Sequence, residues 1–140
     1  MHSRTKLTVR YAETDKMGVA HHSCYPIWFE AGRTDYIKMY GISYTEIEEK
    51  GIIMPLTDLS CKFIRSAKYE DNLIIRTKVM TLSAARISFN YTVKRINEDQ
   101  TETELAYGVT EHGFIDKDTF RPINLRKRLP KLYEEIKATL

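Results

Sequence analysis

The chain has 140 residues, a length that suits one domain, and we expect a single domain over residues 1–140. Hydrophobic residues make up 42% of the chain and charged residues 29%, which excludes the disordered and fibrous classes. No apolar run approaches the roughly 20 residues that cross a bilayer, and the basic N-terminus lacks the apolar segment of a signal peptide. We therefore expect no membrane association. The net charge of only +3 gives no reason to expect nucleic acid as a partner, although it suits a small anionic substrate.

The chain has two cysteines, Cys24 and Cys61. Two are too few for a disulfide framework, and neither belongs to a CxxC motif that would hold structural zinc. We expect both to be buried thiols in a reducing compartment, which predicts a cytoplasmic location.

The N-terminal third predicts a strand, a polar loop and a long helix. Apolar residues alternate over Lys6–Tyr11, as in a half-buried strand, and a polar stretch with a glycine follows over Ala12–Ser23. Ser23 is a suitable N-cap for the helix and Gly41 a suitable stop. The apolar stripe of this helix recurs at steps of three and four residues: Tyr25, Trp28, Phe29, Gly32, Tyr36, Ile37 and Tyr40.

The remaining two thirds predict mainly strands. Ser43–Glu46 matches a capping box, so we expect a short helix that ends at Gly51. The polar segment Asn97–Gln100 predicts a hairpin connection, and Leu129–Leu140 is typical of an amphipathic helix. Four long strands are expected around Leu59–Phe63, Leu73–Val79, Ile87–Val93 and Leu105–Phe114.

The order of the expected elements predicts the fold class. Consecutive strands joined by short connections favour an antiparallel sheet, and one long helix with a wide aromatic stripe can cover one of its faces. We therefore predict an α+β fold in which an antiparallel sheet curls around one central helix, with Gly108 or Gly113 as a bend or bulge in the last strand.

The loop before the long helix holds the most promising chemistry. Asp15 lies in it, and free N–H groups at the start of a helix can bind negative charge that develops on an oxygen. A nearby carboxylate can act as nucleophile or base. Together these two parts are the minimum needed to hydrolyse an activated acyl group.

The same loop resembles a known family. Its residues fit the pattern D-x-x-G-V-x-x-H-x-x-Y of the 4-hydroxybenzoyl-CoA thioesterase and YbgC-like hotdog proteins, at Asp15, Gly18, Val19, His22 and Tyr25. Tyr11–Asp15 is similar to the family's Y-x-D/E-T-D opening. Phe63–Asp71 is similar to its F-x-R-P-A-R/K-Y-x-D segment, except that Ser66 replaces the proline. Trp28–Glu30 with Arg33 resembles the helix between them.

The resemblance implies a hotdog fold and a role for each matched residue. Asp15 would attack the thioester carbonyl or activate water for that attack. The backbone N–H of His22 would hold the thioester oxygen, as oxyanion donors do in other enzymes. No cofactor is required. The acyl group would be bound or its pocket supported by Gly18, Val19, Tyr25 and Trp28.

Other residues admit more than one interpretation. Arg65, Lys68 and Arg86 suit the phosphates of coenzyme A, but ordinary surface charge accounts for them about as well. His21 and His22 lack the spacing and the partner of a metal site, so we expect no metal.

The predicted function is hydrolysis of an acyl-CoA thioester to the free acid and coenzyme A. Two alternatives remain: a non-catalytic acyl-CoA binding protein, and a thioesterase for acyl carrier protein with Arg126–Arg128 as a modest docking patch. A free edge of a long strand can pair with a second copy, which predicts a homodimer or homotetramer built by sheet pairing.

Overall fold

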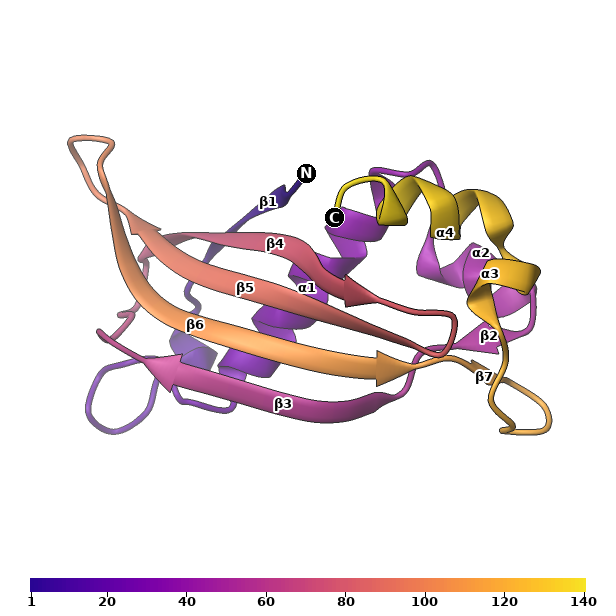
Figure 1. The fold of residues 1–140 in the computed structure, drawn as a ribbon. Coiled ribbons are helices and arrows are strands. Elements are labelled where there is room, and N and C mark those ends of the chain that lie inside the picture. The colour runs from indigo at the N-terminus through magenta and orange to yellow at the C-terminus, as the bar shows by residue number, and fades with distance from the viewer.

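The computed structural model describes residues 1–140 and is built around one antiparallel sheet (Figure 1). The sheet has five strands in the order β1-β4-β5-β6-β3, and each neighbouring pair is antiparallel. The strands span Ser3–Thr8 (β1), Leu56–Phe63 (β3), Asn72–Leu82 (β4), Arg86–Ile96 (β5) and Glu102–Gly113 (β6).

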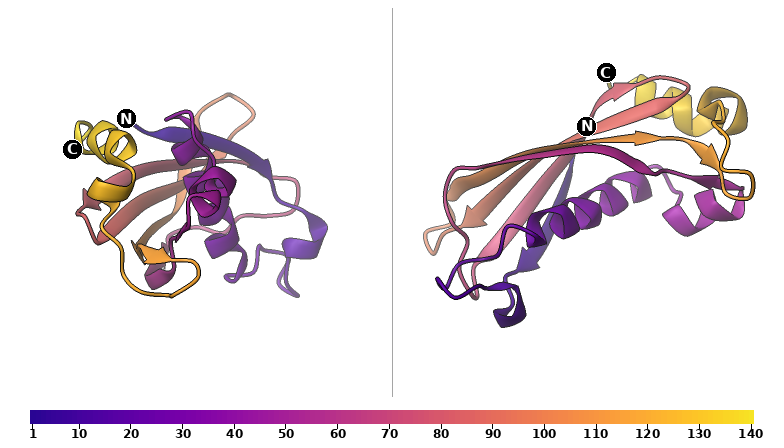
Figure 2. Two further views of the ribbon diagram at one scale, coloured as in Figure 1. Left: turned by 90° about the vertical axis from the view of Figure 1, so that its right-hand side faces the viewer. Right: turned by 90° about the horizontal axis from the view of Figure 1, so that it is seen from below.

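One long helix, α1 (Cys24–Lys38), lies in the concave face of this sheet. In the end-on view of Figure 2 the strands curl around the helix, and the view from below shows it running beneath them. This is the predicted α+β hotdog arrangement. No helix of the chain combines the length and the apolar character needed to cross a bilayer.

The predicted apolar stripe of α1 forms its contact with the sheet. All its members are buried except Tyr40, which is half-buried. Gly32 lies so close to β4 that a methyl group there would clash with Thr77 and Ile75, so this glycine permits the close approach. Phe29 stacks on Tyr91 with ring centroids 4.4 Å apart.

The prediction that Gly108 or Gly113 makes a bend or bulge in β6 was wrong. The register between β5 and β6 shifts between Val93 and Lys94, which is opposite Leu105 and not opposite either glycine. Gly108 instead lies directly against the ring of Phe29, and a Cβ atom there would overlap that ring. The absence of a side chain at Gly108 therefore allows the helix to pack against β6.

The first strand is shifted from its predicted range. It spans Ser3–Thr8 and pairs with β4 as far as Asn72, and Val9 then forms hydrogen bonds with Glu70 and Asp71 in the loop before β4. The chain then forms a short 3-10 helix, η1 (Tyr11–Glu13), so the ring of Tyr11 is 76% exposed and not in a strand.

Shorter elements close one end of the molecule. Ser43 caps α2 (Tyr44–Glu49) by accepting a hydrogen bond from the N–H of Glu46, as predicted. The expected C-terminal helix is two helices, α3 (Leu125–Arg128) and α4 (Pro130–Lys137). Proline lacks an N–H to continue the first helix, and it is well suited to start the second. The short strands β2 (Ile52–Ile53) and β7 (Ile115–Asp116) pair beside them.

The strand β3 has an edge that no strand of the chain covers (Figure 1). Most of its residues are exposed, among them the large apolar side chains of Leu56, Leu59 and Phe63. A flat, apolar strand edge is a template for pairing with another chain.

Candidate active site

Asp15 lies at the base of a tight turn. Its N–H donates to the carbonyl oxygen of Val19 at 2.8 Å, and its own carbonyl accepts from the N–H of Gly18 at 3.0 Å. Gly18 has a φ of 78°, a conformation that favours glycine. One carboxylate oxygen of Asp15, Oδ1, accepts from the N–H of Met17 at 2.8 Å. The other oxygen is free of hydrogen bonds within the chain and so is available to a reacting group.

Glu13 anchors this loop to α1, a role that sequence reasoning missed. Its side chain is buried, and its carboxylate accepts hydrogen bonds from the N–H of Arg10 at 2.8 Å and the indole of Trp28 at 2.9 Å. Burial by itself raises the pKa of Glu13, but these hydrogen bonds outweigh it, and the pKa lies below its ordinary value. The sequence held one signal for this role: Glu13 is an acidic residue in the loop before the helix, and Trp28, on the apolar stripe of that helix, has an indole N–H that needs an acceptor when buried.

The main chain on both sides of the turn is fixed as well. Glu13 offers its carbonyl to the N–H of His21 at 2.8 Å, and Ala20 donates to Ala67 at 2.8 Å. Val19 forms a bridge with Lys68. The loop is thus tied at its centre to the segment after β3, which places Asp15 beside the end of that strand.

A cleft of about 280 Å³ opens in front of Asp15. It joins residues from three places in the sequence: the Asp15 loop, the first turn of α1 and the end of β3. The lining residues are Asp15, Met17, Val19, Ala20, His22, Tyr25, Phe63, Ile64, Arg65 and Ser66. Five of the nine predicted site residues are therefore brought together here, namely Asp15, Val19, His22, Tyr25 and Arg65.

The start of α1 faces this cleft through His22. The N–H of His22 takes no part in the backbone hydrogen bonds of the segment, whereas the N–H of Cys24 already donates to His21. A free N–H at a helix start is suited to bind an oxygen with negative charge. Ser23 is the N-cap residue of α1 as predicted, but its hydroxyl contacts the ring of His21 at 2.7 Å and forms no capping hydrogen bond with the helix.

The two predicted aromatic residues differ in their positions. Tyr25 is buried at the base of the cleft, with its ring edge-on to Phe63 at 4.8 Å, and burial raises its pKa. Trp28 is 3% exposed and lies one layer below, where it packs on Tyr25 and binds Glu13. Within one chain Trp28 supports the pocket and does not line it.

The three predicted phosphate-binding residues are not all at the cleft. Arg65 lines it, and its guanidinium donates to the carbonyl of Glu104 at 3.2 Å. Lys68 is exposed and lies next to the cleft, because it forms a β-bridge with Val19, which lines the cleft. Arg86 is exposed at the opposite end of the sheet, because it pairs with Gly113 and not with the residues near Phe63. A contact between Arg86 and a ligand in this cleft would require a second copy.

Metal binding and cysteine chemistry are not favoured by the arrangement of the side chains. No group of three or more His, Cys, Asp or Glu side chains is arranged to hold a metal ion. Cys24 is buried, and burial, followed by the negative charge of Glu13, raises the pKa of its thiol, which opposes a nucleophilic role. Cys61 is only partly buried, and both thiols are free.

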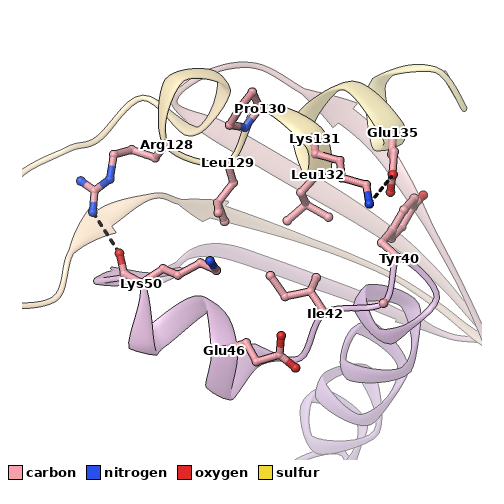
Figure 3. A pocket seen from close by; sticks show the side chains of 11 residues that line it. Tyr40, Ile42, Glu46, Lys50, Arg128, Leu129, Pro130, Lys131, Leu132 and Glu135 are labelled. Atoms are coloured by element: carbon pink, nitrogen blue, oxygen red, sulfur yellow. Dashed lines mark hydrogen bonds and ion pairs between the residues drawn. The ribbon is translucent and has the colours of Figure 1, made fainter.

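A second hollow lies at the other end of the molecule, between α2 and the C-terminal helices (Figure 3). Its charged groups are largely engaged with one another: Lys131 faces Glu135 at 3.9 Å, and Arg128 donates to the carbonyl of Lys50 at 3.1 Å. None of the residues that carry the family resemblance in the Asp15 loop or in Phe63–Asp71 lines this hollow.

Comparison with known proteins identifies the family of the chain. The family model of the thioesterase-like superfamily matches residues 9–140. The chain belongs to that superfamily. The putative acyl-CoA thioesterase YneP of Bacillus subtilis is 32% identical over 129 residues, which cover 91% of this chain and 90% of YneP. The acyl-CoA thioesterase YbgC of Haemophilus influenzae is 25% identical, with 92% of each chain covered.

A solved structure gives the same result for the fold. The DHNA-CoA thioesterase from Staphylococcus aureus has a TM-score of 0.89 and 38% identity to this thioesterase, covering 98% of this chain and 91% of that one. The predicted resemblance to YbgC-like hotdog thioesterases is confirmed, as is the expected class of enzyme at the level of the family.

Proposed function

We propose that this thioesterase hydrolyses acyl-CoA thioesters, with Asp15 as the residue that attacks the carbonyl carbon or activates the attacking water. One observation carries the proposal: Asp15, with one free carboxylate oxygen, and His22, whose N–H is free just before α1, line the same cleft. The relatives named as acyl-CoA thioesterases support the substrate class.

The chemistry follows from these two groups. The free oxygen of Asp15 supplies the negative charge that adds to the carbonyl carbon or removes a proton from water. The N–H of His22 stabilises the negative charge that develops on the thioester oxygen. In other enzymes one such donor stabilises the transition state by about 3 kcal/mol. The thiolate of coenzyme A then leaves. It is a good leaving group, so little acid catalysis is needed.

Residues at the rim suit the rest of the substrate. Arg65 and Lys68 place two positive charges at the mouth of the cleft, where the phosphates of coenzyme A would lie. Gly18 and Val19 bring the turn close to the acyl group. Neither cofactor nor metal is required, and coenzyme A esters together with the free thiols of the chain fit a cytoplasmic location.

The free edge of β3 supports a dimer. Pairing of two β3 strands would continue the sheet across two copies and cover Leu59, Phe63 and Leu56. Because the cleft lies at the end of β3, such a dimer would enclose it, and a homotetramer would require a further contact between two dimers.

The test is Asp15→Asn, which keeps the size of the side chain and removes its charge. We expect release of thiol from acyl-CoA to fall by about 100-fold or more, as for the loss of a general base. Asp118→Asn, on an exposed loop after β7, is the matched control and should keep the wild-type rate. An Asp15→Asn variant as fast as the wild type would refute the mechanism.

Two related functions are separated by the same assay. A purely binding protein would take up acyl-CoA without releasing thiol. A preference for acyl carrier protein would appear as faster hydrolysis of the carrier-bound acyl group, and substitution of the exposed Arg126–Arg128 patch would remove it.

A further inference from the structure

The outer face of the sheet, on the side away from α1, carries a small polar hollow. Gly32 of α1 lies against Ile75 and Thr77 of β4. Side chains alternate along a strand, so Arg76 and Lys78 project from the opposite face, which is turned toward the viewer in Figure 1. The hollow has a volume of about 80 Å³ and is lined by Arg76, Lys78, Asn90 and Thr92.

Strand pairing fixes the arrangement of these four residues. In the ladder between β4 and β5, Arg76 is opposite Thr92 and Lys78 is opposite Asn90. Opposite residues of an antiparallel pair lie about 5 Å apart, and every second residue of a strand lies about 7 Å from the last. Two cations and two neutral hydrogen-bonding side chains therefore share one small patch of the sheet.

The two cations of this hollow have no carboxylate partner. None of the ion pairs of the chain includes Arg76 or Lys78. The carboxylate of Glu102, on β6, is shared between Arg4 at 2.6 Å and Lys94 at 3.7 Å. Like charges at this separation repel each other, so the chain holds a positive charge here that it does not balance.

A nearby histidine responds to the same excess of positive charge. Nδ1 of His2 lies 3.4 Å from Nη2 of Arg76. Burial lowers the pKa of His2, and the charges of Arg76, the N-terminus, Arg4 and Lys78 lower it further. A positive potential of this kind attracts anions.

The two neutral residues complete a set of hydrogen-bond donors. The hydroxyl of Thr92 and the amide of Asn90 line the hollow beside the cations. The amide nitrogen of Asn90 contacts the sulfur of Met80 at 3.7 Å, and because sulfur is a weak acceptor the amide can also donate to a ligand. The hollow is smaller than the roughly 300–1,000 Å³ of sites that enclose a whole small molecule. It therefore suits a compact group with several charged oxygens.

We propose that this hollow binds a phosphate dianion, either free inorganic phosphate or the phosphate group of a larger molecule, and that its binding stabilises the sheet. Arg76 and Lys78 supply the charge, and Thr92 and Asn90 supply the neutral donors. The anion bridges β4 and β5 and balances the two cations. None of these four residues lines the Asp15 cleft, so the site is separate from the proposed catalytic one.

Calorimetric titration with inorganic phosphate, at pH 8 and constant ionic strength, tests the site. We expect a Kd of about 1 mM or below for the wild type. Arg76→Gln should weaken binding at least about tenfold, and Thr92→Val, which keeps the branched shape, about threefold. Lys117→Gln, on the exposed loop after β7, also removes one positive charge and is the control that should keep the wild-type affinity.

Thermal unfolding keeps the test informative for each variant. Arg76→Gln and Lys78→Gln each remove one of two charges that repel each other, so neither should lower the Tm in phosphate-free buffer. Phosphate also stabilises proteins in general, because it is excluded from their surfaces. At equal ionic strength it should nevertheless raise the Tm of the wild type and of Lys117→Gln by more than that of Arg76→Gln. An equal rise in all three proteins would overturn the proposal.

A second ligand distinguishes the sources of the phosphate. Glycerol 3-phosphate carries the same dianionic group on a larger molecule. Comparable affinities for it and for inorganic phosphate, both lost in Arg76→Gln, would support a site for phosphate monoesters. Binding of inorganic phosphate alone, again lost in Arg76→Gln, would support a site for the free ion. No heat of binding for either ligand at about 10 mM, or affinities unchanged in Arg76→Gln, would exclude the site.

Discussion

Glu13 and Asp15 lie two residues apart and have different environments. The carboxylate of Glu13 is buried and bound to Arg10 and Trp28, whereas Asp15 is half-buried and keeps one oxygen free. The first carboxylate holds the loop against α1, and the second faces the cleft. This difference in burial, within one short segment, separates a structural acid from the candidate catalytic one.

The role of Glu13 predicts a pH-dependent loss of stability. Glu13→Gln places an amide N–H₂ group against a donor, which we expect to cost about 1–3 kcal/mol of unfolding free energy at pH 7. The pKa of Glu13 is lowered in the folded chain, so its contribution is present above its unfolded pKa of about 4.3 and is lost as pH falls through the folded value. The difference between wild type and variant should therefore shrink below about pH 4.

Urea unfolding at pH 7 and at pH 3 measures this effect. Glu98→Gln, on the exposed β5–β6 connection, is the control and should change stability by less than about 0.5 kcal/mol. A Glu13→Gln penalty that is the same at both values of pH would contradict the role of the charge.

At the level of elements, two glycines set how closely α1 approaches the sheet. Gly32 on the helix meets β4, and Gly108 on β6 meets the ring of Phe29. His22 and Tyr25, at the start of α1, line the cleft. The distance between the helix and the sheet therefore also affects the shape of the cleft.

Gly108→Ala should destabilise the fold by about 1–3 kcal/mol, because the added methyl group would overlap Phe29 in a well-packed core. Gly113→Ala in the same strand is the control, since a Cβ atom there would be 4.0 Å from its nearest neighbour, Pro55. We expect the control to lie within about 0.5 kcal/mol of the wild type in urea unfolding. Equal losses in the two variants would show that the Phe29 contact does not limit the packing.

At the level of the whole molecule, the unpaired edge of β3 links assembly to activity. The Asp15 cleft lies at the end of this strand, where Phe63 lines it. Edge pairing between two copies would therefore place each cleft at the interface with the second copy.

Leu59→Lys should break this interface, because it places a charge on the apolar edge that pairing would bury. Light scattering at micromolar concentration should show a dimer or tetramer for the wild type and a smaller mass for the variant, with a parallel loss of thiol release. Phe120→Asn, at a more exposed apolar position on the loop after β7, should change neither quantity. A monomeric wild type with full activity would exclude sheet pairing as the basis of the site.

The sequence by itself determined the fold class, the helix stripe and the position of Asp15 next to a helix start. These features depend on local periodicity and on a short motif, which act within a few turns of the chain. The same locality explains the errors. The bounds of β1 depended on its pairing with β4, and the role of Gly108 depended on a ring from α1, a contact across 79 positions of the chain.

Only the tertiary structure decided how the candidate site is assembled. It joined the Asp15 loop to Phe63 and Arg65, placed Trp28 below the cleft, and put Arg86 at the far end of the sheet. The physical reason is that periodicity specifies which face of an element is buried, whereas contacts between elements depend on register, packing depth and the free edge of the sheet.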